Sequence, residues 1–259
     1  MNMKNHGYIG PLILSMFLLL SQSCSKTGPD GLGGPWVKGA LEGYVGATDE
    51  FGKPMEENSG FNIKFESVDL KATTDESGYF RVDDLPTGTY NIICSKQGFV
   101  TARIIGYGFI GGGDVNMGSI WMMPPSTTQV SDIYLEPGEY SDITFSGTIS
   151  PVPTDEERRH IRLFFHKTSD VSSENYLYTD IVTPYVEEEE NGSFSMQLFP
   201  YHISEDFYND NIDTYYVKAY GISYRDWGYP DLETGLRIYP SLNKGGSSSV
   251  AVLEMYDFQ

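Results

Sequence analysis

The chain is short of cysteine, of basic residues and of helical patterns, and each shortage narrows what it can be. It has 259 residues with two Cys, which allow one intrachain disulfide at most. Its 17 Lys and Arg stand against 36 Asp and Glu, a net charge of −19. Because a phosphate backbone is bound through clustered Lys and Arg, we expect no nucleic-acid partner. No window keeps the apolar i, i+3, i+4 spacing of an amphipathic helix.

The usual catalytic motifs are also missing. The sequence contains no Gly-x-Ser-x-Gly, no Ser-x-x-Lys and no His-Glu-x-x-His. His160 and His166 share one face of a predicted strand about 20 Å apart, too far for one metal ion, and we expect both to face solvent. His202 has no predictable partner. We therefore predict a non-enzyme with no catalytic residue, metal or cofactor; an enzyme would need an unforeseen cavity with converging carboxylates.

Two acidic runs offer oxygen ligands of the kind that Ca²⁺ prefers. Glu205 to Asp213 lacks the central Gly and terminal Glu of an EF-hand loop. Glu187 to Glu190 precedes Asn191-Gly192, a strong hairpin signal, and four adjacent carboxylates keep a strand edge soluble. We interpret both runs as solvated surface, with calcium binding as the alternative.

Large apolar and aromatic side chains are abundant, so the chain is not disordered. Aromatic residues make up 14%, with 19 Tyr and 14 Phe. Short alternating runs divided by Gly, Pro, Asp and Asn follow one another, as in Asn62–Glu66, where Ile63 and Phe65 share a face. Such spacing predicts an all-β protein built from antiparallel sandwiches.

The first residues are predicted to be an export signal. Lys4 is followed by an apolar stretch of about 12 residues, too short to span a membrane. The run ends at Leu20-Ser21-Gln22-Ser23-Cys24, which resembles the lipobox of bacterial lipoproteins. That resemblance implies a signal peptide at 1–23 and acylation of Cys24, hence a membrane partner through a lipid anchor (palmitate among its acyl chains). The expected location is the bacterial outer membrane, with the periplasmic and outer faces both open.

A spacer rich in Gly and Pro follows over residues 24–36 and predicts a flexible tether. If Cys24 carries lipid, Cys94 has no partner for a disulfide. Alternation places Cys94 on one face with Tyr90 and Ile92, so we expect a buried structural thiol.

Residues 37–125 carry a recognisable order of motifs. It runs through Leu41–Val45, Asp49–Pro54, Thr74–Phe80, Leu85–Tyr90 and Lys96–Phe99. This order resembles the carboxypeptidase regulatory-like domain, a seven-stranded transthyretin-like or prealbumin-like sandwich. The resemblance implies a non-catalytic accessory domain of a superfamily described as carbohydrate-binding-like. It identifies no catalytic residue in this sequence.

A Pro-containing stretch, Met122–Thr128, breaks the pattern, and we place a domain boundary there. Residues 126–259 show further alternating runs and predict a second β-sandwich, similar in pattern to immunoglobulin-like or fibronectin-like modules. The whole is then two consecutive antiparallel β-sandwich domains after a signal peptide and a Gly/Pro tether.

One loop of the second domain has the composition of a sugar platform. Tyr224, Trp227 and Tyr229 could stack on a pyranose while Asp226 takes its hydroxyls. The alternative is that these rings fold back and cap the sandwich. The favoured function is a structural or binding accessory module with a glycan or protein partner. A glycan-binding surface lipoprotein and an adhesin or pilus-like subunit assembled by strand addition are the rivals.

Overall fold

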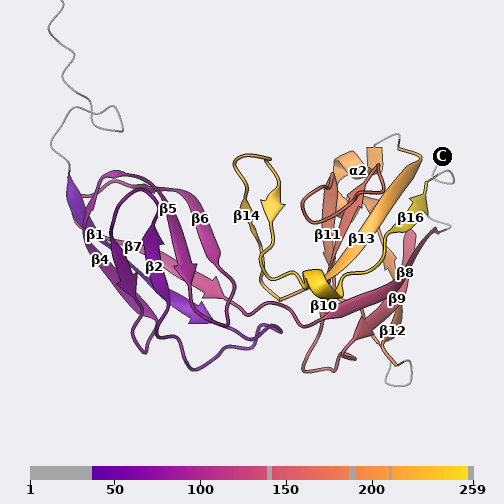
Figure 1. The fold of residues 1–259 in the computed structure, drawn as a ribbon, viewed down its shortest axis with the longest axis horizontal. Helices are drawn as coiled ribbons and strands as arrows, with labels where there is room; N and C mark the ends of the chain where they lie inside the picture. Colours follow the sequence, from indigo (N-terminus) through magenta and orange to yellow (C-terminus); the bar gives the residue numbers. More distant parts are fainter. Residues whose placement is uncertain (1–36, 139–141, 187–190, 210–211, 256–259) are drawn as a thin grey trace, which may run out of the picture. The chain divides into compact units, whose positions relative to one another are not determined.

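The computed structural model describes residues 37–138, 142–186, 191–209 and 212–255, and in them the chain is all-β, as predicted (Figure 1). Residues 38–259 form one compact unit. The predicted export signal, Cys24 and the whole predicted tether lie outside the described residues.

The first seven strands make two sheets. Their bounds are β1 (Lys38–Ala47), β2 (Asn62–Phe65), β3 (Lys71–Thr73), β4 (Tyr79–Pro86), β5 (Gly88–Ser95), β6 (Ala102–Phe109) and β7 (Asp114–Met122). One sheet has the order β4-β1-β7 and the other β3-β2-β5-β6. All neighbours are antiparallel except β1 and β7, which run parallel. Membership of the carboxypeptidase regulatory-like family stays a prediction.

Local sequence explains how these strands are placed. Asp75–Gly78 forms a tight turn, with the Asp75 carboxylate accepting from the backbone N–H groups of Ser77 and Tyr79. Gly78 has φ +83°, a left-handed conformation that favours glycine. The alternating apolar residues point into one core, which includes Ile63, Phe80 and Cys94. Cys94 is buried, as expected, and burial raises the pKa of its thiol to about 12.

A second pair of sheets follows. Its elements are β8 (Gln129–Pro137), β9 (Ile143–Ser150), β10 (His160–His166), β11 (Tyr178–Val182), β12 (Ser193–Leu198), β13 (Thr214–Ile222) and β16 (Ala251–Glu254). The sheet orders are β12-β9-β8 and β11-β10-β13-β16. Between them lies an apolar core in which Phe145, Phe165 and Tyr215 are fully buried. The two cores are separate clusters, and the division into two domains at residue 125 stays a prediction.

The turn at Asn191-Gly192 is present, with positive φ at both residues. β12 pairs with β9. The acidic run before this turn, Glu187 to Glu190, lies outside the described residues. Residues 210 and 211 of the other acidic run, Glu205 to Asp213, also lie outside them. Glu205–Asn209 of that run is the short helix α2, which follows α1 (Pro200–Ile203). Among the described residues no helix is long and apolar enough to cross a membrane.

β10 differs from the sequence expectation because both of its faces are buried. Ile161, Leu163 and Phe165 face the core, but Arg162 and His160 on the other face are also buried. The prediction that His160 faces solvent is therefore wrong. The chain between β13 and β16 covers this outer face, and it includes β14 (Tyr229–Pro230), β15 (Arg237–Ile238) and the 3₁₀ helix η2 (Lys244–Gly246). Phe164, Tyr220 and Tyr239 form an aromatic cluster under that cover.

Candidate binding site

The loop Ser223–Gly228 is held from inside by one buried carboxylate. Oδ1 of Asp226 accepts from the backbone N–H of Gly228 at 3.0 Å, and Oδ2 accepts from that of Ser241 at 2.7 Å. Asp226 is 4% exposed, and burial raises the pKa of its carboxyl despite these bonds. A buried acceptor that fixes two separate segments gives the loop a defined shape.

A guanidinium fixes the same loop from its other end. Arg237 Nε and Nη2 donate to the carbonyl of Trp227 at 3.1 and 2.9 Å, and Nη2 also donates to that of Gly228 at 3.0 Å. Tyr176 anchors Arg237 in turn, because its hydroxyl bonds to the Arg237 N–H and carbonyl. The backbone of Trp227 is therefore tied down while its indole stays 72% exposed.

Two further rings beside this loop rest on glycines. The ring of Tyr224 lies so close to Gly52 that a Cβ there would meet it at 2.1 Å. The Trp121 ring, on β7, covers Gly46 in the same way, at 2.7 Å. Tyr224 also stacks on His160, with ring centroids 5.1 Å apart. The absent side chains at the two glycines allow both rings to lie flat against the backbone.

Two adjoining cavities open beside Trp227. The β7 cavity, about 230 Å³, is lined by Arg103, Ile104, Trp121 and Tyr229 among others. The β10 cavity, about 140 Å³, is lined by His160, Arg162, Ile181, Thr183 and Tyr224. Arg225, Asp226 and Trp227 line both. The two spaces share one wall, and the exposed indole is part of it.

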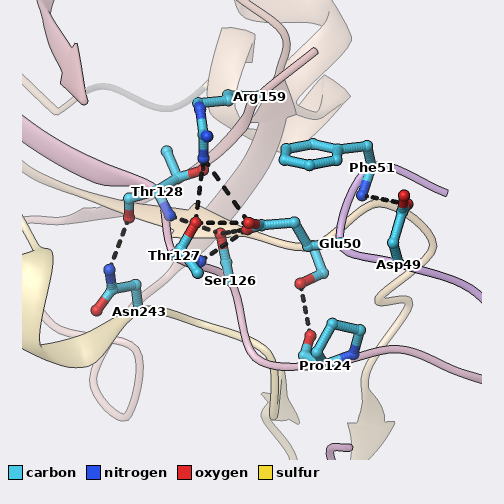
Figure 2. A network of polar contacts seen from close by, with 10 residues as sticks. Asp49, Glu50, Phe51, Pro124, Ser126, Thr127, Thr128, Arg159 and Asn243 are labelled. Atoms are coloured by element: carbon cyan, nitrogen blue, oxygen red, sulfur yellow. Dashed lines mark hydrogen bonds and ion pairs between the residues drawn. The ribbon is translucent and has the colours of Figure 1, made fainter. Parts of the chain in front are cut away.

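A polar network around Glu50 connects the two pairs of sheets next to the candidate loop. Figure 2 shows the Glu50 carboxylate beside Thr127 and Arg159. It accepts from the Thr127 N–H at 2.7 Å and lies 3.8 Å from Arg159 Nη1. The carbonyl of Glu50 accepts from the N–H of Tyr224 at 2.8 Å. The side chains of Glu50 and Arg159 are both nearly buried. Through Glu50 the network joins the loop after β1 to the candidate loop.

The structure places the four ring and carboxylate residues predicted from sequence around one site. Trp227 and Tyr229 line the β7 cavity and Tyr224 the β10 cavity. Asp226 lies inside the loop with both oxygens bonded to backbone N–H groups. Cys24 lies outside the described residues.

Sequence reasoning missed three residues of this site. Trp121, on β7, is 43% exposed and lines the β7 cavity. Arg162 and His160 belong to the β10 cavity because the outer face of β10 is covered. The alternating sequence of β10 does not indicate that its outer face is covered by another segment. In the described part of the chain, no group of three or more His, Cys, Asp or Glu side chains could hold a metal ion.

No protein-family model matches the sequence. A search of curated proteins finds no match. Among solved structures, the chain is similar to one in a type II cohesin–X-dockerin complex from Acetivibrio cellulolyticus, at 19% identity and a TM-score of 0.29. That match covers 33% of this chain and 58%, less than two thirds, of the other.

Two other likenesses extend over most of the sequence. One is to a candidate carbohydrate-binding protein from Bacteroides uniformis, at 13% identity over 85% of this chain and 100% of that one, with a TM-score of 0.28. The other is to a DUF3823 family protein from Parabacteroides merdae, at 13% identity over 85% and 100%, with a TM-score of 0.30. At these scores none of the likenesses carries an argument about function.

Proposed function

We propose that the chain is a non-catalytic, lipid-anchored binding module of the bacterial outer membrane that holds a glycan against Trp227. The lipid would be carried by Cys24, and its attachment is tested by labelling cells with a palmitate analogue. The wild-type chain should take up the label and a Cys24→Ser variant should not. Label on the variant would refute the anchor without bearing on the glycan site.

The observation that carries the glycan proposal is an exposed indole on a rigid support. A pyranose presents an apolar face that stacks on an aromatic ring, and Trp is the largest such ring. Trp227 is 72% exposed while its carbonyl is held by Arg237 and the next N–H by Asp226. Binding to a preformed loop costs less ordering entropy than binding to a mobile one. Tyr229 and Trp121 widen the platform along the β7 cavity.

A glycan-array screen tests this function. The protein used is residues 25–259, which retain the whole described structure. Trp227→Ala should lose binding by roughly tenfold or more, as is typical of an aromatic anchor at the centre of an interface. Tyr134→Ala is the matched control, because Tyr134 is also exposed, at 64%, but lies on β8 and lines neither cavity. The glycan site would be refuted if no glycan on a broad array bound, or if Trp227→Ala bound as tightly as the wild type.

A second candidate function is assembly by strand addition, and a specific feature favours it. Among the described strands, β8 and β16 each end a sheet and so have one unpaired edge. A groove of about 340 Å³ lies between them, lined by residues 132–136 and 249–252. Tyr134 and Val252 stay exposed beside it. An extended peptide could add to either edge through main-chain hydrogen bonds.

Analytical ultracentrifugation over a range of concentrations tests strand addition. Self-assembly through this groove should give oligomers that grow with concentration and that Val252→Lys prevents, since an outward Lys blocks an edge. Val250→Lys, on the same segment before β16 begins, shows whether one position decides the effect. A monomer at every concentration would refute self-assembly.

A further inference from the structure

The candidate site contrasts with the rest of the molecule in its charge. The chain carries a net charge of −19, yet the β10 cavity is lined by Arg162, Arg225 and His160. The carboxylate that also lines it, Asp226, has both oxygens occupied by backbone N–H groups. The space beside Trp227 therefore presents guanidinium groups while its carboxylate is already engaged.

Arg225 is the residue of this cavity that most strongly indicates a ligand. Its φ of +70° is a left-handed conformation that few non-glycine residues adopt, and such outliers cluster at functional positions. Its guanidinium lies 4.6 Å from the ring centroid of Trp121 and 5.8 Å from that of Tyr224. Nε is buried without a hydrogen-bond partner, and no carboxylate in the described residues forms an ion pair with this side chain.

Other arginines of the chain show what a satisfied guanidinium looks like here. Arg81 contacts three carboxylates, and Arg103 pairs with Glu66 at 3.0 Å. Arg237 donates three hydrogen bonds to carbonyls. Arg159 and Arg162 are nearly buried and their Nε atoms also lack a partner, but Nη1 of each donates to a threonine hydroxyl. Guanidinium donors without acceptors are costly, and among these residues only the Arg225 guanidinium has no hydrogen-bond or ion-pair partner in the described part of the chain, which leaves it available to an acceptor from outside.

We propose that the glycan held at Trp227 is acidic and that Arg225 binds its carboxylate. This inference rests on the proposed function and names its ligand class. A planar guanidinium held between rings matches a planar carboxylate through two parallel N–H···O bonds. Because Arg225 and Trp227 line both cavities, the carboxylate of a hexuronate can enter one while its sugar ring lies on the indole.

Paired polysaccharides test the ligand class directly. Residues 25–259 are titrated with galacturonan, glucuronan and alginate, each beside its carboxyl-reduced neutral product, by isothermal calorimetry. We expect at least one acidic member to bind roughly tenfold or more tighter than its neutral partner, the contribution of a charge-assisted hydrogen bond. Raising the salt from 50 to 500 mM should narrow that gap, because screening weakens an exposed ion pair.

Substitutions of Arg225 test whether this residue produces the preference for acidic polysaccharides. Arg225→Gln should bring acidic and neutral affinities together, and Arg225→Lys should keep part of the gap, since it retains the charge without the planar fork. Arg81→Gln is the matched control, an arginine with carboxylate partners away from both cavities, and should leave the gap unchanged. The melting temperature and Trp emission of each variant show whether the loop keeps its shape.

The outcomes separate this inference from the function on which it rests. Equal binding of acidic and neutral members would overturn the acidic ligand and leave the glycan site standing. Binding by neither member of any pair would overturn both. A gap that Arg225→Gln leaves intact in a folded variant would overturn the assignment to Arg225.

Discussion

The two pairs of sheets use polar residues in opposite ways. The ion pairs formed within β1–β7 are at the surface, as in the cluster of Arg81 with Glu42, Asp83 and Asp114. In the region after residue 125 a layer of buried polar groups lies outside the core. Its members include Arg159, His160, Arg162, Ser223, Asp226 and Ser241.

This difference separates fold from function. An apolar core with surface charges is sufficient for a stable sandwich, and the first pair of sheets is built in that way. Buried polar groups cost free energy unless each is paired, so a layer of them needs another reason. Here that layer supports the loop that presents Trp227. Within it, the Nε atoms of Arg159 and Arg162 have no hydrogen-bond partner.

The largest expected effect shows what the two regions share. Phe80→Ala in the first core and Phe145→Ala in the second should each lower the free energy of unfolding by about 3–5 kcal/mol, because both rings are fully buried and each substitution leaves a cavity. Urea unfolding measures the loss. A much smaller loss in one core would mean that this core is loosely packed and that the two regions differ in more than their polar layer.

The next effect tests the polar layer itself. Asp226→Ala should cost about 1–3 kcal/mol, because it leaves two backbone N–H groups without their acceptor near the site. Asp75→Ala is the matched control: this carboxylate also accepts from two backbone N–H groups, but it is exposed and water can replace it. Urea unfolding and the anisotropy of Trp emission report the result. Equal losses would remove the distinction between the regions.

Much of the fold could be predicted from sequence because alternation records burial on one face. Ile63 was assigned to one face with Phe65, and Cys94 to one face with Tyr90, from period-two patterns, and all four side chains are buried. The turn at Asn191-Gly192 was predicted because Asn and Gly tolerate positive φ, a local property that a sequence displays. These features depend on neighbours a few residues away.

The site could be predicted only in part, because its supports come from distant segments. The aromatic loop at residues 224–229 was visible in composition. The burial of His160 was not, since it depends on cover by a segment some 60 residues later in the chain, and neither was the exposure of Trp121 beside Arg225. Contacts of that range leave no periodic trace in the strand that is covered.

A pH titration provides the third test, and its effect is intermediate. Burial lowers the pKa of His160 below its ordinary value of 6.5, so the unfolded chain binds a proton that the folded chain does not. His160 therefore contributes stability above pH 6.5 that is lost as the pH falls from 6.5 toward the folded pKa. His160→Gln should flatten this part of the stability profile. An unchanged slope would show that the ring is not insulated from water.

The smallest effect is expected where charges are exposed. Arg81→Gln removes contacts to three carboxylates at once, yet its side chain is 35% exposed and water and salt screen the pairs. The Arg81 guanidinium holds the pKa of Asp114 below its usual 3.8, so its contribution is present above that pH and lost below it. We expect a change in urea midpoint well below that of Asp226→Ala, and smaller still in 0.5 M salt. Because Arg81 has more ionic partners than any buried arginine described here, a loss as large as that of Asp226→Ala would show that the number of contacts, and not their burial, sets the difference between the two regions.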